Sequence, residues 1–505
     1  MLKFHRLLIA YAVAIPLALM LGYLVATPDM ASVAVVGMVL FVLLVPLLIQ
    51  WSHPLLILCW NSAFIVGFLP GSLPLWMVFA GLTFGMGMIH RLMGRRNFLR
   101  VPELTRPILF LAAVVLLTGR LRGGLGMRLL GGTSFGGKYY FFILAAIMGY
   151  FALTSERISP LKSERAVKWY FLSGATWGMS NLLYGLGPVF FMLYYIVSPD
   201  PAYGQASADF NEGVVKRFGG LGSTGSTLAC FVLARWGLRG ALDVSKPWRL
   251  LLLLAAIVAS LFSGFRSQAA FLGILLVVQF IAEGLWKTPV LPVLCAAGLL
   301  GLAPFLFFTN KMPAAVQRSL ASLPVDIDPN VRAEAEASTE WRWEMWGVVW
   351  REVPKYLLLG KGYAIDPVDL YLTAEATRSG LLRDYEVALF AGDYHNGPLS
   401  VLMPFGIFGM IAFLWLLGAG VMVLYYNYRY GEARLKQVNL ALLSYFLTQS
   451  LFFFVVFGAF SSELSVFLGI LGFSVSLNGG MCRKTDPRAR QPALSSSLAS
   501  SMAVA

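Results

Sequence analysis

Three residues of this sequence combine a proton acceptor with fixed positive charge beside apolar segments. His395 lies in the run Asp393-Tyr394-His395-Asn396, where a long polar segment meets an apolar one. An imidazole with an unperturbed pKa near ~6.5 is well suited to act as a general base. Arg217 and Arg266 border other apolar segments, and the arginine fork matches the oxygens of a phosphate. These residues predict a diphosphate bound next to a proton acceptor.

Each of these residues also has a simpler interpretation. His395 can be an ordinary surface histidine. Arg266 lies in the short turn Ser263-Gly264-Phe265-Arg266-Ser267-Gln268 between two strongly apolar runs. Such an arginine can extend its charge to the membrane surface, although a permanent cation between membrane spans is costly and points to function.

The composition of the chain indicates which elements position these residues. Of its 505 residues, 58% are hydrophobic and 13% charged, and the mean hydropathy is +0.73. These values exclude an ordinary soluble protein. Uninterrupted apolar runs favour membrane-spanning helices over barrel strands. We therefore predict an all-α, polytopic transmembrane helical bundle of about 12–14 spans with one long extracytoplasmic loop. The apolar runs are near 7–26, 31–50, 54–70, 73–90, 107–119, 139–154, 169–196, 218–234, 250–264, 268–285, 289–309, 397–425, 439–458 and 461–478.

The net charge of +14 fits this membrane interpretation better than nucleic-acid binding. With the amino terminus inside, every loop predicted to be cytoplasmic is basic except the turn at 51–53. His395 is then the one histidine on the outer side, because His5, His53 and His90 lie at the inner face. Several basic residues fall outside, where charge does not assist insertion: Arg120, Arg122, Arg128, Lys138, Lys216, Arg217 and Arg266.

The loop at 310–395 differs in composition from the rest of the chain. It holds 13 of the 25 acidic residues and 9 of the 39 basic ones. Trp343, Trp346 and Trp350 in this loop have helical spacing and predict an aromatic face. That face suits a helix lying at the membrane interface, or a lid over a substrate cleft, since aromatic rings also stack on sugars. Both interpretations remain open.

The predicted organisation follows these features. The chain divides into amino-terminal transmembrane helices (1–200), transmembrane helices that carry the arginine motifs (201–309), the extracytoplasmic loop (310–395), carboxy-terminal transmembrane helices (396–480) and a disordered cytoplasmic tail (481–505).

Two patterns that suggest cofactor sites have structural explanations. Gly220-x-Gly222-x-x-Gly225 fits a dinucleotide fingerprint, but an apolar span follows it, and small residues let membrane helices pack closely. Asp326-x-Asp328 can hold a metal ion, but with Pro329 beside it a turn is favoured. We expect no cofactor and no metal ion.

Several short motifs together resemble the O-antigen ligase and polymerase superfamily of bacterial envelope glycosyltransferases. The first is His395-Asn396-x-x-Leu399 followed by Gly406-x-x-Gly409. The others are Arg217-x-Gly219, Ser263-Gly264-x-Arg266, and Arg342-x-x-x-Trp346 followed by Pro354 and Gly360-x-Gly362. The resemblance covers about residues 210–425 and implies the fold of the C-type membrane glycosyltransferases.

This resemblance implies transfer of a glycan from undecaprenyl diphosphate to an acceptor hydroxyl at the periplasmic face of the bacterial inner membrane. His395 would be the general base of an inverting displacement, with Asp393 orienting it. Arg217 and Arg266 would bind the diphosphate. The implied acceptor is lipid A–core, another lipid-linked repeat or a protein hydroxyl, and nucleic acid is not a partner. The supporting residues would be Asn396, Arg342 and Trp346, with Arg120, Arg122, Arg128 and Lys138 forming an outer basic funnel.

Two other functions compete with this one. A transporter or flippase of lipid-linked oligosaccharides would also place arginines in a cavity. A metal-dependent membrane glycosyltransferase would use Asp326 and Asp328.

Overall fold

The computed structural model describes most of the chain. The described residues are 22, 39, 46–67, 71–94, 98–125, 136–200, 215–293, 295–296, 308–381 and 385–484. Contacts divide the chain into two units, Met1–Leu55 and Leu56–Ala505. Apart from Ser52–Leu55 at the start of the first helix below, the elements described belong to the second. The predicted runs at 7–26, 31–50 and 289–309 fall largely outside the described residues, and the tail from residue 485 does so entirely.

Nearly all of the described elements are helices, and the two short strands β1 (Ile65–Val66) and β2 (Leu73–Pro74) pair antiparallel. The helices before residue 300 are α3 (Ser52–Cys59), α4 (Leu75–Leu92), α5 (Pro102–Arg122), α6 (Gly137–Leu153), α7 (Ser163–Leu172), α8 (Trp177–Leu186), α10 (Gly219–Ala241), α11 (Pro247–Phe262) and α12 (Arg266–Ala282). The later helices are α14 (Ala314–Leu320), α15 (Pro329–Tyr356), α16 (Pro367–Arg378), α17 (Tyr385–Ala391), α18 (Gly397–Tyr430), α19 (Lys436–Val455) and α20 (Phe460–Asn478). Short 3-10 turns such as η3 (Ser173–Thr176), η4 (Pro188–Tyr195) and η7 (Ala433–Leu435) connect some of them.

The described helices confirm the predicted fold class, a polytopic helical membrane protein. Five are long and apolar enough to cross a membrane: α4, α5, α18, α19 together with η7, and α20. The apolar helices α6, α11 and α12 are shorter. The total of 12–14 spans stays a prediction, because parts of the chain lie outside the described residues.

Two predicted spans are wrong as single helices. The run at 54–70 is helical only to Cys59, and Ile65 and Val66 then pair with the strand β2. The run at 169–196 is divided among α7, η3, α8 and η4, and Gly187 with φ 96° ends α8. Hydropathy alone located the apolar segments but not the places where the backbone turns.

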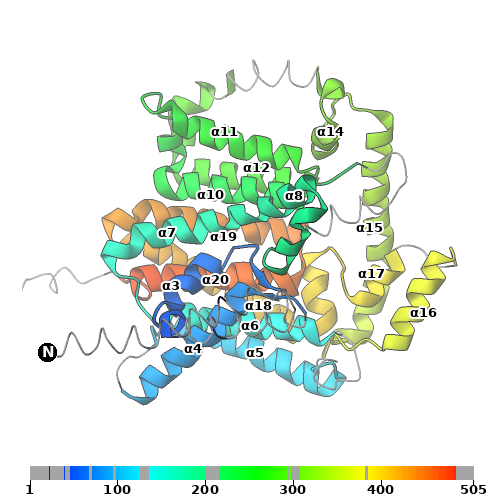
Figure 1. Ribbon diagram of the computed structural model, residues 1–505, viewed down its shortest axis with the longest axis horizontal. Coiled ribbons are helices and arrows are strands. Elements are labelled where there is room, and N and C mark those ends of the chain that lie inside the picture. Colours follow the sequence, from blue (N-terminus) through cyan, green and yellow to red (C-terminus); the bar gives the residue numbers. More distant parts are fainter. Residues whose placement is uncertain are drawn as a thin grey trace, which may run out of the picture. The chain divides into compact units, whose positions relative to one another are not determined.

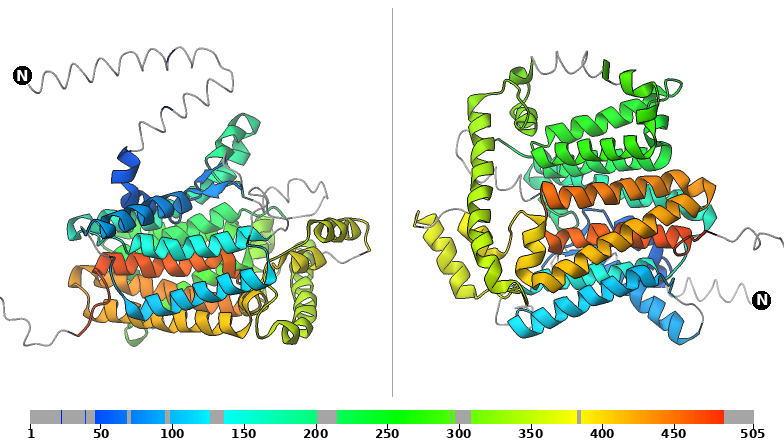
Figure 2. Two further views of the ribbon diagram at one scale, coloured as in Figure 1. Left: turned by 90° about the horizontal axis from the view of Figure 1, so that it is seen from below. Right: turned by 180° about the vertical axis from the view of Figure 1, so that it is seen from behind.

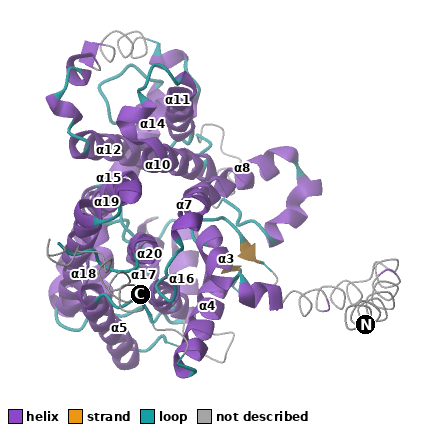
Figure 3. Cartoon of the chain, turned by 90° about the vertical axis from the view of Figure 1, so that its left-hand side faces the viewer, coloured by secondary structure: helices purple, strands orange, loops and turns teal. Residues whose placement is uncertain are grey.

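Helix α20 lies in the interior of the bundle, as the view along the helices in Figure 3 shows, and it contacts α6, α18 and α19. Glycines let the partners approach: a Cβ on Gly469 would lie 2.0 Å from the Trp60 ring, and one on Gly472 3.0 Å from Leu153. Phe473 stacks on Tyr170 with 4.2 Å between ring centroids. Because lipid is as apolar as these side chains, close packing of this kind holds membrane helices together.

Helix α18 is broken near its amino-terminal end. Gly406 adopts φ 63° and ψ −161°, two residues after Pro404, which cannot donate the helical hydrogen bond. The segment after α15 inserts at this break. There the amide of Ile407 donates to the carbonyl of Leu357 (2.6 Å), and that of Gly362 to Pro404 (3.0 Å). The glycines of the motifs at 360–362 and 406–409 thus join the segment after α15 to α18.

We expect Gly360→Ala to destabilise the protein strongly. Gly360 has φ 70°, and a Cβ there would lie 2.1 Å from the carbonyl oxygen of Pro404. The left-handed backbone alone costs an alanine about 1–2 kcal/mol, and the contact adds to this. Gly347→Ala is the matched control. Gly347 lies within α15, and no heavy atom is within 4 Å of an added Cβ, so this substitution should raise the free energy of unfolding by about 0.5–1 kcal/mol. Thermal unfolding in detergent measures both, and equal midpoints would contradict the prediction.

The segment predicted to be extracytoplasmic is largely helical in its described part and centres on α15. Figures 1 and 2 show α15 running across one end of the bundle, at a steep angle to α10, α12 and α18. The tryptophan spacing correctly predicted this helix, but its rings do not share one environment. Trp343 and Trp350 are 66% and 55% exposed, whereas the Trp346 indole donates to the carbonyl of Tyr394 (2.8 Å). Trp346 therefore fastens α15 to the segment that carries His395.

Candidate active site

His395 is held between two anchored neighbours. On one side Trp346 binds the Tyr394 carbonyl, and on the other the Asn396 side chain caps α18 by accepting from the amide of Leu399 (3.1 Å). His395 itself adopts φ 48°, a left-handed conformation that costs a non-glycine residue about 1–2 kcal/mol. Strained backbone persists only where the surroundings impose it, and it gathers at functional sites.

The imidazole of His395 is largely enclosed. Its ring lies 5.4 Å from Trp341 and 5.3 Å from Phe457, measured between centroids, and the side chain is 27% exposed. Nδ1 is buried without a hydrogen-bond partner among the described residues. The nearest carboxylate oxygen, Oδ1 of Asp393, is 3.6 Å away, which is too long for a hydrogen bond but close enough for a charge interaction.

These surroundings set the protonation of His395. Burial lowers its pKa because the charged imidazolium loses hydration; Asp393 raises the pKa, and Arg342 lowers it. The net direction is downward. The ring therefore stays neutral, and can accept a proton, down to a lower pH than the ring of a free histidine does.

The predicted arginines Arg217 and Arg266 lie near the amino-terminal ends of α10 and α12. Arg217 precedes α10, and the amide of the next residue, Phe218, donates to the carbonyl of Ser263 (2.8 Å). This bond ties the Arg217 segment to the turn that carries Arg266. The guanidinium of Arg318, on α14, donates to the carbonyl of Gly264 (2.7 Å) in the same turn.

Helix α15 supplies the partners of these arginines. Glu334 accepts from Arg217 (3.0 Å) and from Arg318 (3.1 Å) through the same oxygen. Thr339 accepts from Nη1 of Arg266 (3.0 Å). Arg342 follows on this helix, and its buried Nε has no hydrogen-bond partner in the described part of the chain.

The group holds more positive than negative charge. Burial and the neighbouring Arg217 lower the pKa of Arg318 to about 10, against the opposing effect of Glu334. Burial likewise lowers the pKa of Arg342, with further contributions from Arg266 and Arg217. Four guanidinium groups therefore lie near a single carboxylate, that of Glu334. Such an arrangement suits an anion with more than one negative charge.

Arg342 connects this group to His395. It lies on α15 between Thr339, which binds Arg266 (3.0 Å), and the His395 segment: the ring of the adjacent Trp341 is 5.4 Å from the His395 ring. The charge of Arg342 also lowers the pKa of His395. The structure thus brings together four residues that are distant in sequence: Arg217, Arg266, Arg342 and His395. Sequence reasoning missed Arg318, Glu334 and Thr339, which had no motif to distinguish them from the other polar residues of the loop.

A pocket of about 240 Å³ lies beside the segment that carries His395, because Asp393 and Tyr394 are among its lining residues. Asp393, Lys138, Ser461 and Ser462 give it polar groups. Aromatic residues, among them Tyr139, form other parts of the wall. Polar groups beside aromatic rings are suited to a sugar.

The remaining candidates have structural surroundings of their own. Nε of Arg122 donates to the carbonyl of Gly360 (2.9 Å), so Arg122 positions the segment inserted at the α18 break. Arg120 is exposed in the last turn of α5, and Arg128 lies outside the described residues. The Asp328 side chain caps α15, and Asp326 accepts from Asn310 (2.9 Å).

The glycine pattern at 220–225 is explained by helix packing. A Cβ on Gly220 would lie 2.2 Å from the carbonyl oxygen of Trp177, and one on Gly225 2.5 Å from Oγ of Ser260. These glycines allow α10 to pack against α8 and α11.

Residues 220–414 match the family model described as O-antigen ligase. A search of curated proteins gave no match. The matched segment contains Arg266, Arg318, Arg342 and His395, and begins three residues after Arg217.

Proposed function

We propose that this multi-pass membrane protein, a member of the O-antigen ligase superfamily, transfers a glycan from a polyprenyl diphosphate to an acceptor hydroxyl on the periplasmic side of the inner membrane. The family match supports glycan transfer of the ligase or polymerase type at the membrane. The observation that carries the detailed proposal is the connected set Arg217, Arg266, Arg342 and His395, in which an anion site adjoins a neutral base.

His395 acts as the general base. Asp393 faces Nδ1, so we assign the proton of the neutral ring to Nδ1 and leave Nε2 to accept the proton of the acceptor hydroxyl. The acceptor oxygen forms a bond to the anomeric carbon as the bond from that carbon to the diphosphate oxygen breaks. A single displacement of this kind inverts the anomeric configuration.

The arginines bind and stabilise the departing diphosphate. The electron pair of the broken bond stays on the phosphate oxygen, so negative charge grows there during the reaction. Arg217 and Arg266 offer fixed donors for that charge. Glu334 holds Arg217 in place before the donor arrives. The pocket lined by Asp393 and Lys138 is the place from which an acceptor sugar reaches His395.

The direct test uses purified protein with undecaprenyl-diphosphate-linked glycan and an acceptor glycan. We expect a new glycosidic bond of inverted configuration and the release of undecaprenyl diphosphate. Movement of the intact lipid-linked glycan across proteoliposomes, with no new bond, would instead identify a transporter. Comparing acceptors in the same assay assigns the protein to ligase or polymerase.

The pH profile should respond in opposite directions to the two charges beside His395. Arg342 lowers the pKa of His395, so Arg342→Gln should raise it and move the acid limb of the transfer rate to higher pH. Asp393 raises that pKa, so Asp393→Asn should move the acid limb to lower pH. Measuring kcat against pH for both variants checks the assignment. Shifts in the same direction would contradict His395 as the base.

A further inference from the structure

We propose that the pocket between α4, α5 and α6 binds an anionic phospholipid, with Arg91 and Arg100 on its phosphate. The pocket measures about 440 Å³, within the usual range for ligand sites. None of its described lining residues belongs to the group around His395. The inference is independent of the transfer reaction.

The pocket lies at the level of lipid headgroups. Its residues come from the carboxyl-terminal half of α4, from the segment before α5 and the first turns of α5, and from Phe151 near the end of α6. Both helices are candidate membrane spans, and these two ends are adjacent, so they mark one surface of the membrane. The amide of Leu99 donates to the carbonyl of Thr154 (2.9 Å). This bond fixes the segment before α5 to the end of α6 and forms one wall.

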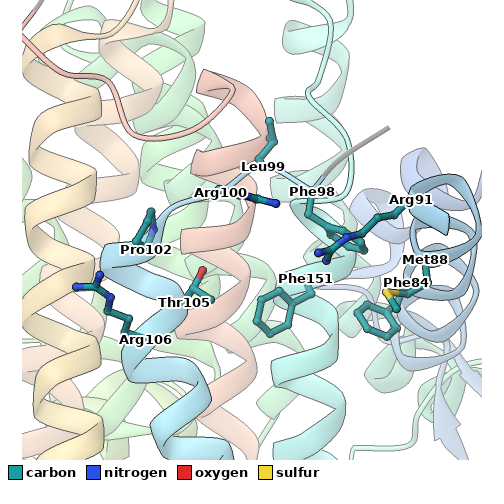
Figure 4. A pocket seen from close by; sticks show the side chains of 10 residues that line it. All are labelled: Phe84, Met88, Arg91, Phe98, Leu99, Arg100, Pro102, Thr105, Arg106 and Phe151. Atoms are coloured by element: carbon teal, nitrogen blue, oxygen red, sulfur yellow. The ribbon is translucent and has the colours of Figure 1, made fainter. Parts of the chain in front are cut away.

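The charges of the pocket favour a phosphate. In Figure 4, Arg91 and Arg100 extend toward each other across the pocket, whereas the guanidinium of Arg106 is directed away. No acidic residue is among the ten that line the pocket. The carboxylate in the first turn of α5, Glu103, pairs with Arg483 (3.0 Å). Glu103 is therefore paired with an arginine that does not line the pocket.

The floor of the pocket favours an acyl chain below that phosphate. The rings of Phe84 and Phe98 lie 6.0 Å apart between centroids, and Met88 and Phe151 complete the apolar lining. Leu109 lies farther along α5 and is 53% exposed. An apolar surface therefore continues along α5 from the pocket. Arginines above an apolar wall match an anionic phospholipid better than a soluble phosphate.

The test is native mass spectrometry of the full-length protein in detergent, titrated with phosphatidylglycerol and, separately, phosphatidylcholine. We expect preferential binding of phosphatidylglycerol. Each arginine near a headgroup contributes about fivefold in affinity, the equivalent of about 1 kcal/mol, so Arg91→Gln with Arg100→Gln should weaken binding about twentyfold or more. Arg239→Gln, an exposed arginine outside the pocket, is the matched control and should change little.

A second variant separates the pocket from general surface charge. Thr105→Phe keeps every arginine but fills part of the cavity, and it should also reduce phosphatidylglycerol binding. Unchanged binding in this variant, or an equal loss with Arg239→Gln, would overturn the proposal. Displacement of the lipid by millimolar inorganic phosphate would overturn it too, because it would show a site for a soluble anion.

Discussion

His395→Ala is expected to lower the transfer rate about 10²–10⁴-fold, the range for loss of a general base. The imidazole is the proton acceptor beside Asp393, which lines the neighbouring pocket. An alanine leaves the acceptor hydroxyl without a proton acceptor. The rate of product formation at saturating donor measures the effect.

Two further variants make this result specific. His395→Asn keeps a side chain that tolerates the left-handed backbone of this position (φ 48°) but removes the base, so it should be as inactive as the alanine variant and should unfold at nearly the wild-type temperature. His90→Ala at the end of α4 is the histidine control and should keep full activity. Transfer by His395→Asn at the wild-type rate would rule out His395 as the base.

The sequence indicated His395, Arg217 and Arg266 as candidate site residues but not the contacts that hold them. A single histidine and two arginines at the edges of apolar runs stood out because charge is costly there. Arg318 and Glu334 did not stand out, since they are two of many charged residues in a polar segment. Their roles arise only when α14 and α15 fold against the turn at Gly264.

The fold was predictable to a similar extent. Apolar runs marked α18, α19 and α20 closely, because these helices must satisfy their own backbone groups in lipid. The run at 169–196 is equally apolar but bends at Gly187, which hydropathy does not register. The insertion of the 357–362 segment at the α18 break depends on glycines whose left-handed φ only the folded chain reveals.

Arg266→Lys is expected to lower kcat about 10²-fold or more, although it keeps the positive charge. Arg266 has one guanidinium nitrogen on Thr339 (3.0 Å), which orients the fork and leaves its other donors for the diphosphate. A lysine is a single-point donor that cannot reproduce this geometry. Removing one donor to developing negative charge typically costs 10²–10³ in kcat.

Comparing kcat with KM separates two roles of Arg266. If the arginine acts on charge that grows as the diphosphate leaves, the loss falls on kcat; if it only holds the donor, the loss falls on KM. Thr339→Val is the matched control, since it removes one hydrogen bond worth about 1 kcal/mol, or about fivefold, and leaves the guanidinium in place. A normal kcat with a raised KM in Arg266→Lys would refute the leaving-group role while keeping Arg266 as a donor-binding residue.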